Sequence, residues 1–285
     1  MGEHTSRTMW RKYEPIHSSI YFYPLAAQKY AEIGLKGGWM SYFASRSVSL
    51  GTPDANVIQA TFYHFSPELI ARAIPDAWRL ANIEDILSTR LQIAQQLLTS
   101  AQAIPSYPGV KNQLSDLVQL AKSLPRYGRV LYSSLVNLDW TASPEIMAFG
   151  AATLLREHRG DTHNAILLSH SISGIQSNIL QIADGRVSFN LLDSSRGWNE
   201  EQWRVGISQL IERDILTKDS TIEKPHFSKV GRKLKWEIES ATDVNSDPWG
   251  DLEPKALHQF SELLGSISES VKTFIGFPRE NPTGV

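Results

Sequence analysis

The chain has 285 residues, a formal net charge of −2 and no cysteine. This length is enough for two modest domains, and the nearly balanced charge excludes a general attraction to nucleic acid or acidic membranes. The absence of cysteine excludes disulfides, thiolate nucleophiles, iron–sulfur clusters and cysteine-based zinc sites. Because no apolar run approaches the roughly 20 residues that span a bilayer, we expect a cytoplasmic protein without a membrane partner.

Helices are predicted along most of the chain, separated by proline and glycine. They span residues 7–23, 24–33, 38–47, 82–103, 110–124, 143–158, 163–169, 173–183, 199–211, 228–241 and 254–274. Pro53 and Pro67 fit first helical turns, and Ser66 is a good cap for the second of these. A break is predicted at Gly160, and residues 278–285 are expected to form a frayed tail.

The pattern over residues 198–241 is helix, short strand, turn, short strand, helix. Asn199 and Gln202 form a capping box at the start of the first helix, whose apolar residues then recur on one face. The short strands are predicted at residues 215–217 and 226–227, and Ser228 caps the helix that follows. This order is typical of a winged helix after its first two helices.

Five segments carry a resemblance to a known family: EPIHSSIYFYP, GLKGGWMSYFASRSVSLG, ATFYHFSPELIARAIPDAW, ATLLREHRGDTHNAIL and SRGWNEEQW. They resemble a largely actinobacterial family of helix-turn-helix, MarR-like proteins, in which the EHRGD-x-H block is the most specific motif. The resemblance covers nearly the whole chain. It implies a winged-helix-like C-terminal region, and it implies no substrate and no catalytic residues.

The predicted fold class is mainly α, with a helical N-terminal domain and a C-terminal winged-helix-like (MarR-like) region that carries a small β-wing. The predicted domains are residues 1–140, helical and rich in aromatic residues, 141–250, winged-helix-like, and 251–285, the C-terminal helix and tail. By analogy with MarR-like folds, the helix at 254–274 is expected to support a homodimer.

Charge disfavours DNA as a partner. A recognition helix needs cationic or amide side chains at its exposed start, whereas Glu200 and Glu201 stand there and repel phosphates. A basic run points the other way and keeps DNA contact open as the less favoured interpretation; it comprises Lys224, His226, Lys229, Arg232, Lys233 and Lys235.

Residues 157–163, EHRGDTH, are the candidate catalytic cluster: His158, Arg159, Asp161 and His163, beside Glu157. Three interpretations stay open. The first is a metal site, although this spacing is no standard ligand pattern. The second is a proton-transferring His158 or His163 with Arg159 holding an anionic group. The third is a structural junction tied by an ion pair and buried histidines. A single E-x-x-H at Glu14 and His17 is only weakly indicative of a metal, so no metal ligand is assigned.

The first 65 residues are rich in aromatic side chains with basic residues among them. Such walls are typical of a pocket for a flat or apolar ligand. The candidate ligand-binding residues are His17, Tyr21, Trp39, Tyr42, Arg46, Tyr63 and His64.

The function favoured by these patterns is a cytoplasmic small-molecule-binding protein on a helix-turn-helix scaffold, with weak or no DNA binding and with catalysis left open. The alternative is a MarR-type transcriptional regulator that responds to a ligand. The sequence identifies no cofactor.

Overall fold

The computed structural model describes residues 4–284. These residues form fifteen α-helices and two 3-10 helices, and no β-strand is found among them. The elements are α1 (Thr5–Ser18), η1 (Ser19–Tyr21), α2 (Pro24–Glu32), α3 (Trp39–Ser47), η2 (Val48–Leu50), α4 (Ala55–Thr61), α5 (Pro67–Ala71), α6 (Asp76–Leu80), α7 (Ile83–Ser100), α8 (Val110–Lys122), α9 (Val130–Leu135), α10 (Pro144–Ser169), α11 (Gly174–Ala183), α12 (Phe189–Arg196), α13 (Glu200–Glu212), α14 (Lys229–Asn245) and α15 (Pro254–Ile275).

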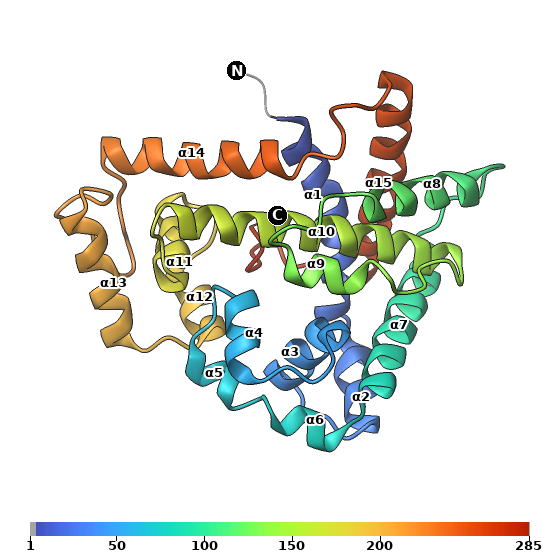
Figure 1. Ribbon diagram of the computed structural model, residues 1–285, viewed down its shortest axis with the longest axis horizontal. Helices are drawn as coiled ribbons and strands as arrows, with labels where there is room; N and C mark the ends of the chain where they lie inside the picture. Colours follow the sequence, from blue (N-terminus) through green and yellow to red (C-terminus); the bar gives the residue numbers. More distant parts are fainter. Residues whose placement is uncertain (1–3, 285) are drawn as a thin grey trace.

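The long helix α10 runs through the middle of the molecule (Figure 1). It packs against α1, α7, α8, α9 and α14. Residues 146–155 are all buried, as expected for a helix that is apolar on every side. Gly150 permits close packing of α10 against the segment that precedes it, because a Cβ there would lie 2.5 Å from the ring of Trp140.

Two clusters of buried apolar side chains form the interior. The first cluster is formed by side chains from the segment that runs from α1 through α9, from the first half of α10 and from α15. The second joins the end of α10 to α11, α12, α13 and the start of α14. α10 therefore carries its N-terminal half in one cluster and its C-terminal end in the other. α15 lies along α1, and its apolar stripe, which includes Phe260, Leu264 and Val271, is buried within the chain.

Three consecutive helices, α11, α12 and α13, precede and include the first helix of the segment predicted to be winged-helix-like, and we call them the helix-turn-helix unit. Residues 197–199 join α12 to α13, and Gly197 makes this turn with a φ of +76°. The predicted capping box is confirmed: the Asn199 side chain accepts from the N–H of Gln202, whose side chain accepts from the N–H of Asn199. The apolar stripe of α13 points inward, with Trp203 and Leu210 fully buried. Figure 1 shows α13 at the edge of the molecule, with one side open to solvent.

The predicted β-wing is wrong. Within residues 4–284 the only β-type pairing is a single antiparallel bridge between Leu216 and Phe227. One physical reason is that the side chains of the intervening polar segment close the turn, since Ser220 accepts from the N–H of His226 and Thr221 from that of Lys224. Pro225 also lacks a donor for a ladder. The mainly α part of the predicted fold class is correct.

Two further expectations on the local structure are corrected. α10 continues through Gly160 without a break, because packing on both sides outweighs the weak helix propensity of glycine. The C-terminal tail is held rather than frayed over its described part: Glu280 accepts from the N–H of Ser188, and Asn281 is only 2% exposed. The sequence patterns do not predict α12, which Ser188 caps by accepting from the N–H of Leu191. Among the described residues, none of the helices has the length and apolar character needed to cross a membrane.

Candidate functional site

A cavity of about 500 Å³ lies between the N-terminal helices and α10. Its walls come from α1, α2, α3, residues 61–65, α10, the inner face of α14 and the C-terminal tail, with single residues of α9, α11 and α12. All seven candidate ligand-binding residues line it: His17, Tyr21, Trp39, Tyr42, Arg46, Tyr63 and His64. Of the candidate catalytic residues, Arg159, Asp161 and His163 line it as well, whereas His158 does not.

The helical geometry of α10 separates the members of the EHRGDTH block. Residues four apart share a face of a helix, so Arg159 and His163 point together toward α14. There Arg159 pairs with Asp243 at 2.7 Å, and His163 lies 3.0 Å from the hydroxyl of Thr242. The structural interpretation expected an ion pair within residues 157–163, but Arg159 pairs with Asp243 of α14 instead.

His158 occupies a different side of α10. Its ring packs edge-on against that of Tyr132, with centroids 5.0 Å apart. Neither ring nitrogen makes a hydrogen bond of good geometry with any described residue. Burial, with Arg129 nearby, lowers the pKa of His158 to about 3, so the ring is neutral at pH 7. His158 therefore lies apart from the other candidate catalytic residues and outside the cavity wall.

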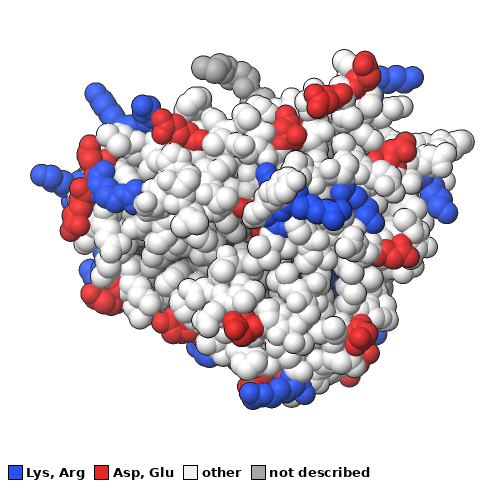
Figure 2. Space-filling view, in the orientation of Figure 1, with Lys and Arg blue, Asp and Glu red and all other residues white. Residues whose placement is uncertain are grey.

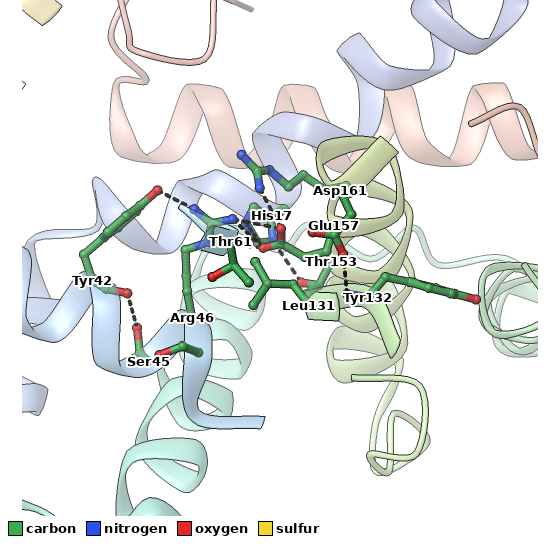
Figure 3. Close-up of polar contacts among 12 residues, drawn as sticks. His17, Tyr42, Ser45, Arg46, Thr61, Leu131, Tyr132, Thr153, Glu157 and Asp161 are labelled. Atoms are coloured by element: carbon green, nitrogen blue, oxygen red, sulfur yellow. Dashed lines mark hydrogen bonds and ion pairs between the residues drawn. The ribbon is translucent and has the colours of Figure 1, made fainter. Parts of the chain in front are cut away.

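Glu157 is the centre of the polar network in the cavity wall. Figure 3 shows Arg46 reaching from α3 to the Glu157 carboxylate, with His17 and Thr153 nearby. Arg156 bonds the same carboxylate at 2.6 Å. Burial alone would raise the pKa of Glu157, but the guanidinium groups of Arg156 and Arg46 outweigh it and hold the pKa well below its usual value. A charged Glu157 therefore joins α3 to α10.

Three histidines line the cavity in the neutral form; His17 is buried, and His64 and His163 are partly buried. Burial lowers the pKa of His17 and of His64 well below the usual value, and it lowers that of His163 to about 4. His17 lies 3.1 Å from the Thr153 hydroxyl, whereas Nδ1 of His64 has no hydrogen-bond partner among the described residues. Neutral rings offer hydrogen-bond donors and acceptors rather than charge.

Asp161 behaves in the opposite way. Its carboxyl group accepts from the backbone N–H of Tyr132 at 3.0 Å, as Figure 3 shows. Burial raises the pKa of Asp161 to about 7 despite this hydrogen bond. Asp161 is therefore the one group of the predicted catalytic set that titrates near neutral pH. Proton transfer by this set stays a prediction.

Sequence reasoning missed part of the cavity wall. Arg156, Arg186, Arg196 and Glu239 line it, and Lys235 does so too, although the sequence placed Lys235 in a DNA-facing basic run. Lys235 is buried and pairs with Glu239 at 2.6 Å. The spacing of Lys235, Glu239 and Thr242 at i, i+4 and i+7 could have indicated a polar inner face of α14.

No metal centre emerges from the geometry. Within residues 4–284 no group of three or more histidine, aspartate or glutamate side chains is placed to hold a metal ion. In the E-x-x-H pair, Glu14 accepts from Nε1 of Trp10 at 3.0 Å instead.

The exposed face of α13 is poor in free cations. Arg204 pairs with Glu200 one turn away, and Arg213 donates to the carbonyls of Ser171 and His170 at the end of α10. Lys233 on α14 pairs with Glu237 at 3.6 Å. Figure 2 shows basic and acidic side chains interspersed over this side of the molecule rather than gathered in one continuous stripe.

Comparison with known protein families gives a match over most of the chain. The sequence model of a helix-turn-helix family matches residues 6–278. Neither the curated proteins nor the solved structures provide a match. The helix-turn-helix part of the expected resemblance is thereby confirmed; the match does not bear on MarR-type proteins, an actinobacterial origin or the EHRGD-x-H motif.

Proposed function

Since the chain belongs to the helix-turn-helix family, we propose that it is a small-molecule-binding protein on a helix-turn-helix scaffold with weak or no affinity for DNA. The observation that carries this proposal is the cavity of about 500 Å³ with its aromatic and polar walls. Ligand pockets in proteins usually measure roughly 300–1,000 Å³ and combine apolar walls with a few polar groups.

The walls suit a flat ligand. The ring of Phe65 lies 5.3 Å from that of Trp39 and 5.6 Å from that of Tyr42, centroid to centroid. Aromatic faces of this kind bury a planar compound over a large area. The buried Nδ1 of His64, which lacks a partner among the described residues, adds a polar group that a ligand can satisfy.

A neutral fluorescent compound, N-phenyl-1-naphthylamine, tests this proposal. We expect its fluorescence to rise on binding to the purified chain and Ser45→Phe to abolish the rise, because Ser45 lines the cavity. Ser41→Phe, on the same wall, is a second filling variant. Ser266→Phe, at an exposed position of α15, is the control. Unchanged fluorescence with the wild type, or equal binding by the filled and control variants, would contradict the proposal.

A ligand-responsive DNA-binding regulator is the second candidate, and one observation favours it. The carbonyl of His64 accepts from Nδ2 of Asn178 on α11 at 2.9 Å and from Nε1 of Trp198 before α13 at 3.0 Å. The N–H of Ser66 also donates to the carbonyl of Arg196 on α12. Residues 61–66 therefore touch the cavity on one side and the helix-turn-helix unit on the other.

A salt series separates the two candidates. A regulator should bind duplex DNA with an affinity that falls steeply between 50 and 200 mM salt, by about a thousandfold or more for six phosphate contacts. We expect instead weak binding of mixed-sequence duplex, measured by fluorescence anisotropy. Tight and salt-sensitive binding would favour the regulator.

A further inference from the structure

Arg196 differs from every other cation in the cavity wall. It is the last residue of α12, its side chain lines the cavity, and the residue is only 8% exposed. Its Nη2 donates to the Pro282 carbonyl at 3.3 Å, and its guanidinium carbon lies 4.5 Å from the centre of the Phe65 ring. Nε of Arg196 has no hydrogen-bond partner among the described residues.

The remaining cationic side chains of the wall are each paired with a carboxylate. Arg46 and Arg156 share Glu157, and Lys235 pairs with Glu239. Arg159 pairs with Asp243 and Arg186 with Asp184, in both cases at 2.7 Å. Within residues 4–284, no aspartate or glutamate lies within ion-pair distance of Arg196.

A buried cation without a counter-ion is costly, and proteins normally pair it. Burial lowers the pKa of Arg196 to about 10, which still leaves the guanidinium charged at pH 7. Because the other five cations of the wall have carboxylate partners, Arg196 carries the positive charge that a bound anion would balance.

We propose that the guanidinium of Arg196 binds a carboxylate group of the ligand, with the body of the ligand against the aromatic wall beside it. This inference rests on the proposed function of the cavity as a small-molecule site. A guanidinium forms two parallel hydrogen bonds with a carboxylate, and the free Nε of Arg196 is one of the donors needed. A singly charged group fits better than a phosphate dianion, because the neighbouring cations already have carboxylate partners.

The Phe65 ring supports the geometry. It stacks near the Arg196 guanidinium and also contacts Trp39, so charge and aromatic surface adjoin within one part of the cavity. The class of ligand inferred is therefore an aromatic or other flat apolar carboxylic acid.

Calorimetric titration of the full chain with 2-naphthoate and 2-naphthamide tests the inference, since the two compounds share a ring system and differ in charge. We expect naphthoate to bind at least about tenfold tighter than the amide, as one charge-assisted pair predicts. Arg196→Met should remove this preference and leave amide binding, while Arg196→Lys should keep part of it. Arg72→Met, at an exposed position outside the cavity wall, is the control and should keep the full preference.

Several outcomes would overturn the inference. Equal affinity of the wild type for the two compounds needs no variant and would exclude a carboxylate subsite while leaving the cavity proposal in place. Equal weakening of both by Arg196→Met would assign Arg196 a structural role only. Tighter binding of 2-naphthyl phosphate than of naphthoate would overturn the choice of a carboxylate. Failure of naphthoate, naphthamide and the neutral naphthylamine to bind would overturn the proposed function, and the inference with it.

Discussion

Arg46 and Glu157, 111 residues apart in the chain, are joined by three hydrogen bonds of 3.1, 2.7 and 2.8 Å inside the protein. Their side chains are 5% and 2% exposed. Arg46 also donates to the hydroxyl of Tyr42, and Arg156 and His17 stand on other sides of the carboxylate. This one buried carboxylate pairs with two guanidinium groups and connects helices that only the folded chain brings together.

Glu157→Gln should destabilise the protein strongly, because it leaves the buried Arg46 and the partly buried Arg156 with less compensating charge. Removing one member of a buried ion pair typically costs about 3–5 kcal/mol. The free energy of unfolding, measured with urea, should fall by that amount. Glu262→Gln, at an exposed position of α15, should stay within about 0.5 kcal/mol of the wild type. Equal effects of the two changes would show that the Glu157 network contributes nothing to stability.

Asp161→Asn should alter the pH dependence of stability. The pKa of Asp161 is raised from 3.8 to about 7, so between these values the folded state keeps a proton that the unfolded state releases. This group therefore makes stability fall as pH rises through that window. The amide removes the effect: we expect the variant to match the wild type near pH 4 and to exceed it at pH 8 by up to about 4 kcal/mol, at about 1.4 kcal/mol per pKa unit.

Urea unfolding at pH 4, 6 and 8 measures this difference. Asp116→Asn, at an exposed position of α8, is the matched control and should leave the pH profile of the wild type unchanged. A constant difference between Asp161→Asn and the wild type at all three pH values would show that Asp161 titrates normally.

The buried histidines predict a loss of stability on acidification. Burial lowers the pKa of His163 from 6.5 to about 4, so the unfolded state gains a proton first as the pH falls through this window. Its contribution is fully present above pH 6.5 and is lost toward pH 4, with a slope of about 1.4 kcal/mol per pH unit. His163→Phe should reduce the slope between pH 6.5 and 4.5 in urea unfolding. An unchanged slope would mean that His163 is protonated in the folded state.

Local sequence rules predicted much of the helical structure. Asn199 and Ser228 were identified as caps, and both accept hydrogen bonds from the first turn of their helices. The aromatic and basic residues of the first 65 positions were expected to line one pocket, and the structure places all seven candidates in one cavity. These features depend on neighbours in the chain or on composition, which a sequence displays directly.

Long-range pairing could not be predicted in the same way. The block at residues 157–163 was interpreted as one cluster at a break, but an unbroken helix turns its side chains in different directions. Arg159 pairs with Asp243 and Glu157 pairs with Arg46 only because the folded chain brings α14 and α3 next to different parts of α10. Arg196 gave no indication in the sequence, since its unusual property is the absence of a nearby carboxylate among the described residues.

Gly197→Ala should cost more stability than Gly185→Ala. Both glycines have positive φ, of +76° and +72°, so alanine is strained at each by about 1 kcal/mol. Only at position 197 would the new Cβ collide, lying 2.7 Å from Cβ of Leu69, whereas position 185 has open space. We expect urea unfolding to show an additional loss of about 1–3 kcal/mol for Gly197→Ala, the typical cost of overpacking. Equal losses would mean that the turn before α13 is not packed against α5.

Replacing the acidic start of α13 should create the DNA affinity that we propose the protein lacks. Glu200 and Glu201 are exposed in the first turn of α13, where a DNA-binding helix would meet phosphates. The double change Glu200→Lys and Glu201→Lys should tighten binding of mixed-sequence duplex at 50 mM salt by about tenfold or more. It should steepen the slope of log K against log salt by about 2, since each phosphate contact adds about 0.9.

The control carries the same change in net charge at two exposed positions, the N-cap of α15 and a residue within this helix: Glu253→Lys with Glu262→Lys. If α13 is the surface that contacts DNA, fluorescence anisotropy should show a much smaller gain in DNA affinity for this control. Its new cations lie away from the helix-turn-helix unit. Equal gains in DNA affinity in the two double variants would show that only the net charge matters. The acidic first turn of α13 would then not explain weak DNA binding.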